Sequence, residues 1–149
     1  MRAAVSEFSR RLMNVVALLA VGGIVVSSMS LQNHYAKSKT AYCDFGQAFN
    51  CDIVNRSEYS EIFGIPVALI GMLGYGALAG LAVVYRERRD TPAMLFGSAA
   101  AGLAFASYLT YIEAHVLGVW CILCLSSFTL IAMATLLSGL IWWKRDVGK

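Results

Sequence analysis

Four long apolar runs, separated by polar segments, dominate the pattern of this chain. They contain no Asp, Glu, Lys, Arg or His, and they cover Leu12–Leu31, Ile62–Tyr85, Pro92–Ile112 and Cys121–Trp143. Each run is long enough to cross roughly 30 Å of hydrocarbon as a helix. The pattern therefore predicts an all-α membrane protein, a bundle of four transmembrane helices in which residues 1–149 form a single integral membrane domain.

The longest polar segment, residues 32–61, separates the first two runs. We expect it to be a large outer loop that contains a short helix leading into the second span. Asn55 with Glu58, or Ser57 with Glu61, offers an N-cap for that helix. Small residues in the second and third runs are expected to let the helices approach closely. These are Gly71, Gly74, Gly76 and Gly80 in the second run and Gly97, Ala101 and Ala104 in the third.

Composition and charge fix the class and the orientation. With 58% hydrophobic and 14% charged residues, the chain is not an ordinary soluble domain. Nine of the twelve Lys and Arg residues flank the chain termini and the 86–91 turn, whereas Lys37, Lys39 and Arg56 fall in the outer loop. The positive-inside rule places both termini and that turn in the cytoplasm. The first run exceeds a usual signal core, which favours an uncleaved helix over an export signal.

This topology puts all four cysteines at the outer face, where disulfides form and persist. Cys43 and Cys51 lie in the outer loop. Cys121-Ile122-Leu123-Cys124 opens the fourth run after an expected short outer turn, residues 113–120, that contains Glu113. Two thiols at i and i+3 share one face of a helix start, where free N–H groups and the helix dipole favour a thiolate. We therefore expect a lowered pKa for Cys121 and thiol–disulfide exchange at this pair.

Other uses of four cysteines are open to this sequence. A zinc site would need convergent thiolates, and a purely structural pair of disulfides would brace the outer loops. Redox chemistry is favoured because both pairs share one face and an i, i+3 disulfide at a helix end is constrained and labile. In that case one pair would exchange with a soluble dithiol protein, and the other would face an apolar electron acceptor in the bundle, for which a membrane quinone is the natural candidate.

The chain resembles the vitamin K epoxide reductase family, in particular its bacterial and archaeal disulfide-forming members, which act like DsbB. The resemblance implies a prokaryotic plasma (inner) membrane. The resemblance covers about residues 12–143. It is carried by Cys43-Asp44, Cys51-Asp52, Ser57, Phe63-Gly64-Ile65-Pro66, Gly71, Gly74-Tyr75 and Cys121-Ile122-Leu123-Cys124. DsbB-type oxidases place their C-x-x-C in the first outer loop, the reverse of the order in this chain.

The resemblance implies a role for each cysteine. Cys43 would exchange with a thioredoxin-like, DsbA-like partner, and Cys51 would pass the disulfide to Cys121. Cys124 would be the thiolate next to the quinone, of the ubiquinone or menaquinone (vitamin K) type. Many relatives carry a fused thioredoxin-like domain, and because none follows Trp143 here we expect the partner to be a separate protein.

The resemblance also implies a quinone site. Ser57 would lie over the quinone ring and Phe63 would help to wall the pocket. Phe128 stands where animal members have a Tyr that holds the quinone oxygen, and it cannot donate a hydrogen bond.

Three functions follow as hypotheses. The first is an oxidase that passes electrons from partner thiols to a membrane quinone, with no metal. The second is a vitamin K epoxide or quinone reductase driven by partner thiols, against which Phe128 argues. The third is a non-enzymatic four-helix membrane protein with structural disulfides, such as a small transporter. The absence of ionisable residues inside the runs argues against ion-coupled transport.

Overall fold

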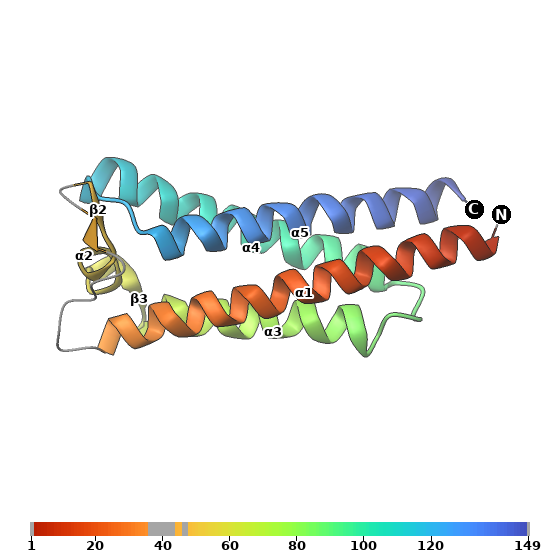
Figure 1. Ribbon diagram of the computed structural model, residues 1–149, viewed down its shortest axis with the longest axis horizontal. Coiled ribbons are helices and arrows are strands. Elements are labelled where there is room, and N and C mark those ends of the chain that lie inside the picture. Colours follow the sequence, from red (N-terminus) through yellow and green to blue (C-terminus); the bar gives the residue numbers. More distant parts are fainter. Residues whose placement is uncertain (1, 36–43, 46–47, 149) are drawn as a thin grey trace.

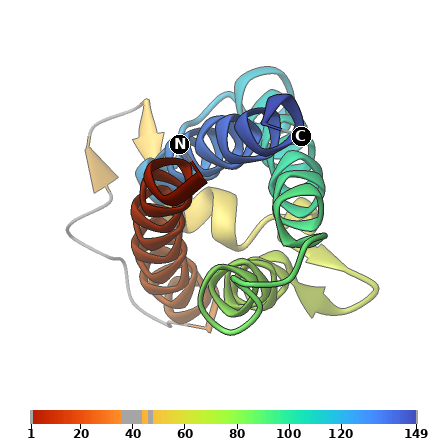
Figure 2. The same ribbon diagram turned by 90° about the vertical axis from the view of Figure 1, so that its right-hand side faces the viewer.

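The computed structural model describes residues 2–35, 44–45 and 48–148. Its long helices are α1 (Arg2–Tyr35), α3 (Val67–Val83), α4 (Thr91–Ile112) and α5 (Ile122–Val147). They run side by side along one axis, with the two chain termini at the same end (Figure 1). Viewed along that axis, the helices surround the short loop helix α2 (Cys51–Asn55) at the far end (Figure 2). The all-α fold class is confirmed.

Three helical segments of the described chain are long and apolar enough to cross a membrane: Glu7–Tyr35, Thr91–Leu117 and Ile122–Val147. Helix α3 is equally apolar but has 17 residues, at the lower end of the roughly 17–25 that span a bilayer. It begins five residues later than the expected second span. Strands β3 (Glu61–Ile62) and β4 (Ile65–Pro66) form a small antiparallel hairpin before it.

The outer loop is folded differently from the expectation. Helix α2 begins at Cys51, and Asn50 is its N-cap, with the side-chain oxygen accepting the N–H groups of Asp52 at 3.1 Å and Ile53 at 3.2 Å. The expected cap at Asn55 is wrong because this residue ends the helix. Ser57 precedes a short 3₁₀ turn, η1 (Glu58–Ser60), but makes no side-chain cap there.

A second difference lies between α4 and α5. The segment expected to be a short turn continues as a π-helix, η2 (Glu113–Leu117), and ends at Gly118 with a left-handed φ of 66°. Trp120 then pairs with the loop strand β2 (Phe49–Asn50): its N–H donates to Ala48 O at 2.8 Å, and its carbonyl accepts Asn50 N–H at 3.0 Å. This strand-like contact ties the loop to the residue before Cys121. Strand β2 also pairs with β1 (Asp44–Phe45).

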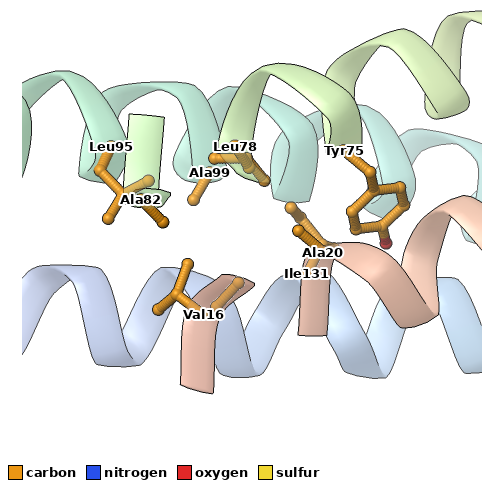
Figure 3. Packing of buried hydrophobic residues seen from close by; sticks show 9 residues of the cluster. Val16, Ala20, Tyr75, Leu78, Ala82, Leu95, Ala99 and Ile131 are labelled. Carbon is orange, nitrogen blue, oxygen red and sulfur yellow. The ribbon is translucent and has the colours of Figure 1, made fainter. Parts of the chain in front are cut away.

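The core of the bundle is a layer of small and branched apolar side chains and one tyrosine ring, from all four long helices (Figure 3). It consists of Val16 and Ala20 from α1, Tyr75, Leu78 and Ala82 from α3, Leu95 and Ala99 from α4, and Ile131 and Ala134 from α5.

Close helix approach depends on glycines that are mostly different from the expected ones. A Cβ at Gly23 would lie 2.3 Å from the Tyr75 ring, and one at Gly71 would lie 2.9 Å from Ser27 Oγ. The expectation fails for the others, Gly74, Gly76, Gly80 and Gly97, which have open space at the Cβ position.

Candidate functional site

The loop helix and the start of α5 bring two cysteines into contact. Cys51 is disulfide-bonded, whereas Cys121 and Cys124 are free thiols. The Cys121 thiol donates to the Cys51 sulfur at 3.1 Å, and both side chains are fully buried. A thiol held against a disulfide sulfur is the starting arrangement of thiol–disulfide exchange.

Local structure explains why these sulfurs meet. Cys51 is the first residue of α2, directly after the Asn50 cap, and Cys121 directly follows the Trp120 bridge to the same strand. The amide of Asn55 lies 3.9 Å from the Cys121 sulfur. An apolar cluster around the pair contains Val54, Leu123, Val26, Met29, Leu117 and Val119. The sulfurs therefore meet in a site from which bulk water is excluded.

Cys121 caps α5 and lies just before the apolar span that begins at Ile122. The hydrogen bond from the Cys124 side chain lowers the pKa of Cys121, and backbone N–H groups of the first turn act in the same direction, while burial opposes both. The sequence-based expectation of a lowered pKa at this position is confirmed. A thiolate at Cys121 is the nucleophilic form that attacks a disulfide.

Glu113 completes the surroundings of the C-x-x-C pair. It is 2% exposed at the start of η2, and its Oε2 accepts the Cys121 backbone N–H at 3.1 Å. Sequence analysis placed this residue in a short outer turn and gave it no role. The available signal was an acidic residue at the end of an apolar run, eight positions before Cys121.

A cavity of about 360 Å³ lies between the helices below the loop. Cys124, Glu113 and Ser57 are among its lining residues, so it adjoins the exchange site. Apolar side chains form most of its walls, including Val54, Val67, Ile70, Leu78, Phe105, Leu109, Ile112, Leu117, Leu123 and Ile131. The volume is within the range of roughly 300–1,000 Å³ that small-molecule sites occupy.

A few polar groups are placed in this apolar cavity. Tyr75 OH donates to Ser127 O at 2.8 Å and lies 2.8 Å from Ser127 Oγ. His34 also lines the cavity and contacts Glu61 Oε1 at 2.9 Å through Nε2. Ser57 Oγ donates to Val54 O at 2.8 Å. Apolar walls with a few oriented polar groups beside a free thiol fit a flat, apolar, carbonyl-bearing molecule such as a quinone.

The predicted site residues separate into two groups. Cys51 and Cys121 are in contact, and Cys124 and Ser57 both line the adjoining cavity. Cys43 lies outside the described residues.

The two phenylalanines are placed elsewhere. Phe63 forms the β3–β4 turn with a positive φ of 53°, its side chain is fully exposed, and it is not among the cavity-lining residues. Phe128 is half-buried on α5 and also does not line the cavity. Neither residue therefore has the place at the cavity wall that the resemblance implied.

Comparison with known families agrees with this geometry. The family model described as "Vitamin K epoxide reductase family" matches residues 14–138, most of the chain, including the loop cysteines and the C-x-x-C pair. Members of this family are generally membrane oxidoreductases that use cysteines, a quinone and no metal. Within the described residues, no group of three or more His, Cys, Asp or Glu is arranged to hold a metal ion. The protein therefore belongs to the vitamin K epoxide reductase family of integral membrane oxidoreductases.

Proposed function

We propose that this protein is a quinone-linked thiol–disulfide oxidoreductase that generates disulfides for extracytoplasmic proteins. Electrons would pass from a separate thioredoxin-fold, DsbA-like partner to Cys43 and Cys51, then to Cys121 and Cys124, and finally to a membrane quinone. The observation that carries this proposal is the 3.1 Å contact between the free thiol of Cys121 and the disulfide-bonded sulfur of Cys51.

This contact supports exchange in either direction because both directions share one mixed disulfide. In the oxidase direction, a Cys51 thiolate attacks Cys121 of an oxidised Cys121–Cys124 pair, the Cys51–Cys121 bond forms, and Cys124 leaves as a thiolate. A second thiolate of the loop pair then attacks Cys51, which releases Cys121. The loop pair ends oxidised and the C-x-x-C pair ends reduced by two electrons.

The cavity supports a quinone as the final acceptor. When bound, a quinone supplies a two-electron oxidant for the reduced C-x-x-C pair. Cys124 lines the cavity and would present its sulfur to that molecule, and Ser57 would contact it from the loop side. Tyr75 supplies a phenolic hydroxyl from α3, and the apolar walls exclude water from the reacting sulfur.

The arrangement of ends supports the proposed orientation. The two termini and the turn after α3 lie at one end of the bundle, and the loop helix α2 lies at the other (Figure 1). The basic end carries Arg10, Arg11 and Lys144, which the positive-inside rule assigns to the cytoplasm. The cysteines then face the extracytoplasmic side, where a secreted dithiol protein can reach the loop.

Reduction of vitamin K epoxide is the alternative use of the same relay. It would consume the same partner thiols and differ in the acceptor. The Phe at position 128, which offers no hydroxyl and does not line the cavity, makes quinone the better supported acceptor.

The test is quinone-dependent oxidation of a reduced thioredoxin-fold protein by the purified protein in lipid nanodiscs, with a vitamin K epoxide assayed in parallel. We expect turnover with quinone and its loss in Cys124→Ala. Ser126→Ala is the matched control, since Ser126 lies in the same helix turn but outside the cavity lining. Acid-trapped complexes should link the partner to Cys43.

Two results would contradict the proposal. Absence of quinone reduction with any dithiol partner would leave the cysteines as structural braces. Turnover that survives both Cys43→Ser and Cys51→Ser with a protein substrate would remove the loop pair from the path.

A further inference from the structure

Glu113 is a buried acidic residue in a place where an acid is costly. Its side chain is 2% exposed, and carboxylates are almost never fully buried without partners. It belongs to η2, a π-helical segment, and such segments recur at functional sites. An alanine or leucine would fill this position without the cost of desolvating a carboxyl group. The contacts of the carboxyl group must therefore account for its presence.

The two carboxyl oxygens have different surroundings. Oε2 accepts the Cys121 backbone N–H at 3.1 Å, which fixes the side chain at the start of α5. Oε1 is fully buried and has no hydrogen-bond partner among the described residues. The carboxyl group also interacts with the Cys124 side chain, and both residues line the same cavity. One oxygen therefore holds the backbone and the other is free to take a proton beside the thiol.

The other titratable groups near Glu113 are already engaged or uncharged. Cys121 and Cys124 are the reacting thiols, and Tyr75 is hydrogen-bonded to Ser127. His34 is paired with Glu61, and Tyr59 completes the titratable groups of the lining. The described cavity lining contains neither Lys nor Arg, so no fixed cation holds the carboxyl group in its charged form.

We propose that Glu113 is the proton-transfer residue of the Cys121–Cys124 pair: it takes the Cys124 thiol proton when that sulfur becomes a nucleophile, and gives it to the reduced acceptor. This inference rests on the proposed function. Formation of the Cys121–Cys124 disulfide releases two electrons and two protons. The quinone takes up the two electrons and two protons to become a quinol. Glu113 carries one of these protons and ends each cycle in its starting form, and the other comes from Cys121.

The test is single-turnover reduction of a soluble quinone analogue by the prereduced Cys51→Ser protein, in which the C-x-x-C pair acts without the loop. The rate constant is measured from about pH 5 to pH 9 with and without Glu113→Gln. Glutamine keeps an oxygen to accept the Cys121 N–H, so positioning is retained and proton transfer is lost. Glu87→Gln, an exposed change near the opposite end, is the matched control.

We expect Glu113→Gln to lower the rate constant by roughly 10²-fold, the lower end of the usual general acid–base contribution. The limb of the pH profile that reports the carboxyl group should disappear, and Glu113→Asp should restore part of the rate. A Glu113→Gln rate that equals the parent at every pH, or falls equally at every pH, would overturn the proposal and leave Glu113 as a positioning residue.

A second measurement separates this inference from the proposed function. The Cys51→Ser protein with and without Glu113→Gln is reacted with a small diffusible aromatic disulfide, which needs no quinone. If the parent protein reduces no quinone, the proposed function fails. A pH dependence of Cys124 oxidation that changes in Glu113→Gln still supports proton transfer, and an unchanged one overturns it.

Discussion

The packing of Tyr75 against α1 makes a sharp prediction about Gly23. A methyl group at this position would lie 2.3 Å from two ring carbons and 2.5 Å from the ring carbon bonded to the Tyr75 Cβ. That last carbon moves only if the Tyr75 χ1 changes or α3 itself shifts, so the clash cannot be relieved by swinging the far end of a flexible side chain. Overpacking of this kind costs roughly 1–3 kcal/mol, against a helix-propensity gain of up to about 1 kcal/mol for Gly→Ala.

Gly23→Ala is therefore expected to destabilise the bundle by about 1–2 kcal/mol in net terms, a fall of a few degrees in Tm. The neighbouring Gly22→Ala is the matched control, because its methyl group would meet only Leu130, at an ordinary 3.8 Å. Thermal unfolding of both variants in the same detergent measures the difference. Since Tyr75 OH is bonded to Ser127 on α5, we also expect slower quinone reduction in Gly23→Ala. Equal stability of the two variants would refute this account of the α1–α3 contact.

Three further variants test the exchange site and the cavity. Asn50→Ala removes the α2 cap and should cost about 1 kcal/mol of local helix stability, seen as faster amide hydrogen exchange across α2, whereas Asn50→Asp should retain protection. Cys124→Ala removes the hydrogen bond that lowers the pKa of Cys121. The pKa of Cys121 should therefore rise, so that ultraviolet titration detects its thiolate at higher pH. Cys124→Ser should raise this pKa less. Tyr75→Phe keeps the ring but loses the bond to Ser127, so quinone reduction should weaken mainly through KM, and an unchanged KM would argue against contact with the acceptor.

The sequence correctly predicted the features that depend on local patterns of residues. Uninterrupted apolar runs predicted helices, and the two-thiol spacing at the start of the last run predicted a helix start and a lowered pKa for Cys121. Ser57, which the resemblance places over a quinone ring, lines the cavity. These features depend on local periodicity and on helix-end chemistry.

Features set by tertiary contact were missed. Helix α2 starts at Cys51 because Asn50 caps it, while the sequence offered equally good caps further on. Glu113 was expected in a short outer turn because nothing local shows that a π-helix would bury it against Cys121. Phe63 was expected at the cavity, but the positive φ at this residue turns the chain into a hairpin and points the ring outward. Hydrophobicity alone does not show whether a side chain faces the cavity or the outside of the bundle.

The measurement that tests the central claim most directly is formation of a Cys51–Cys121 disulfide in a protein whose other two cysteines, Cys43 and Cys124, are replaced by Ser. With these sulfurs 3.1 Å apart in the folded protein, mild oxidation in nanodiscs should join them nearly completely, as peptide mapping by mass spectrometry would detect. A Cys51–Cys124 pair, with Cys43 and Cys121 replaced, should join much more slowly. Two results would contradict the account: no Cys51–Cys121 bond in the folded protein, or both bonds forming equally fast. In either case the exchange between the loop pair and the C-x-x-C pair does not occur between Cys51 and Cys121.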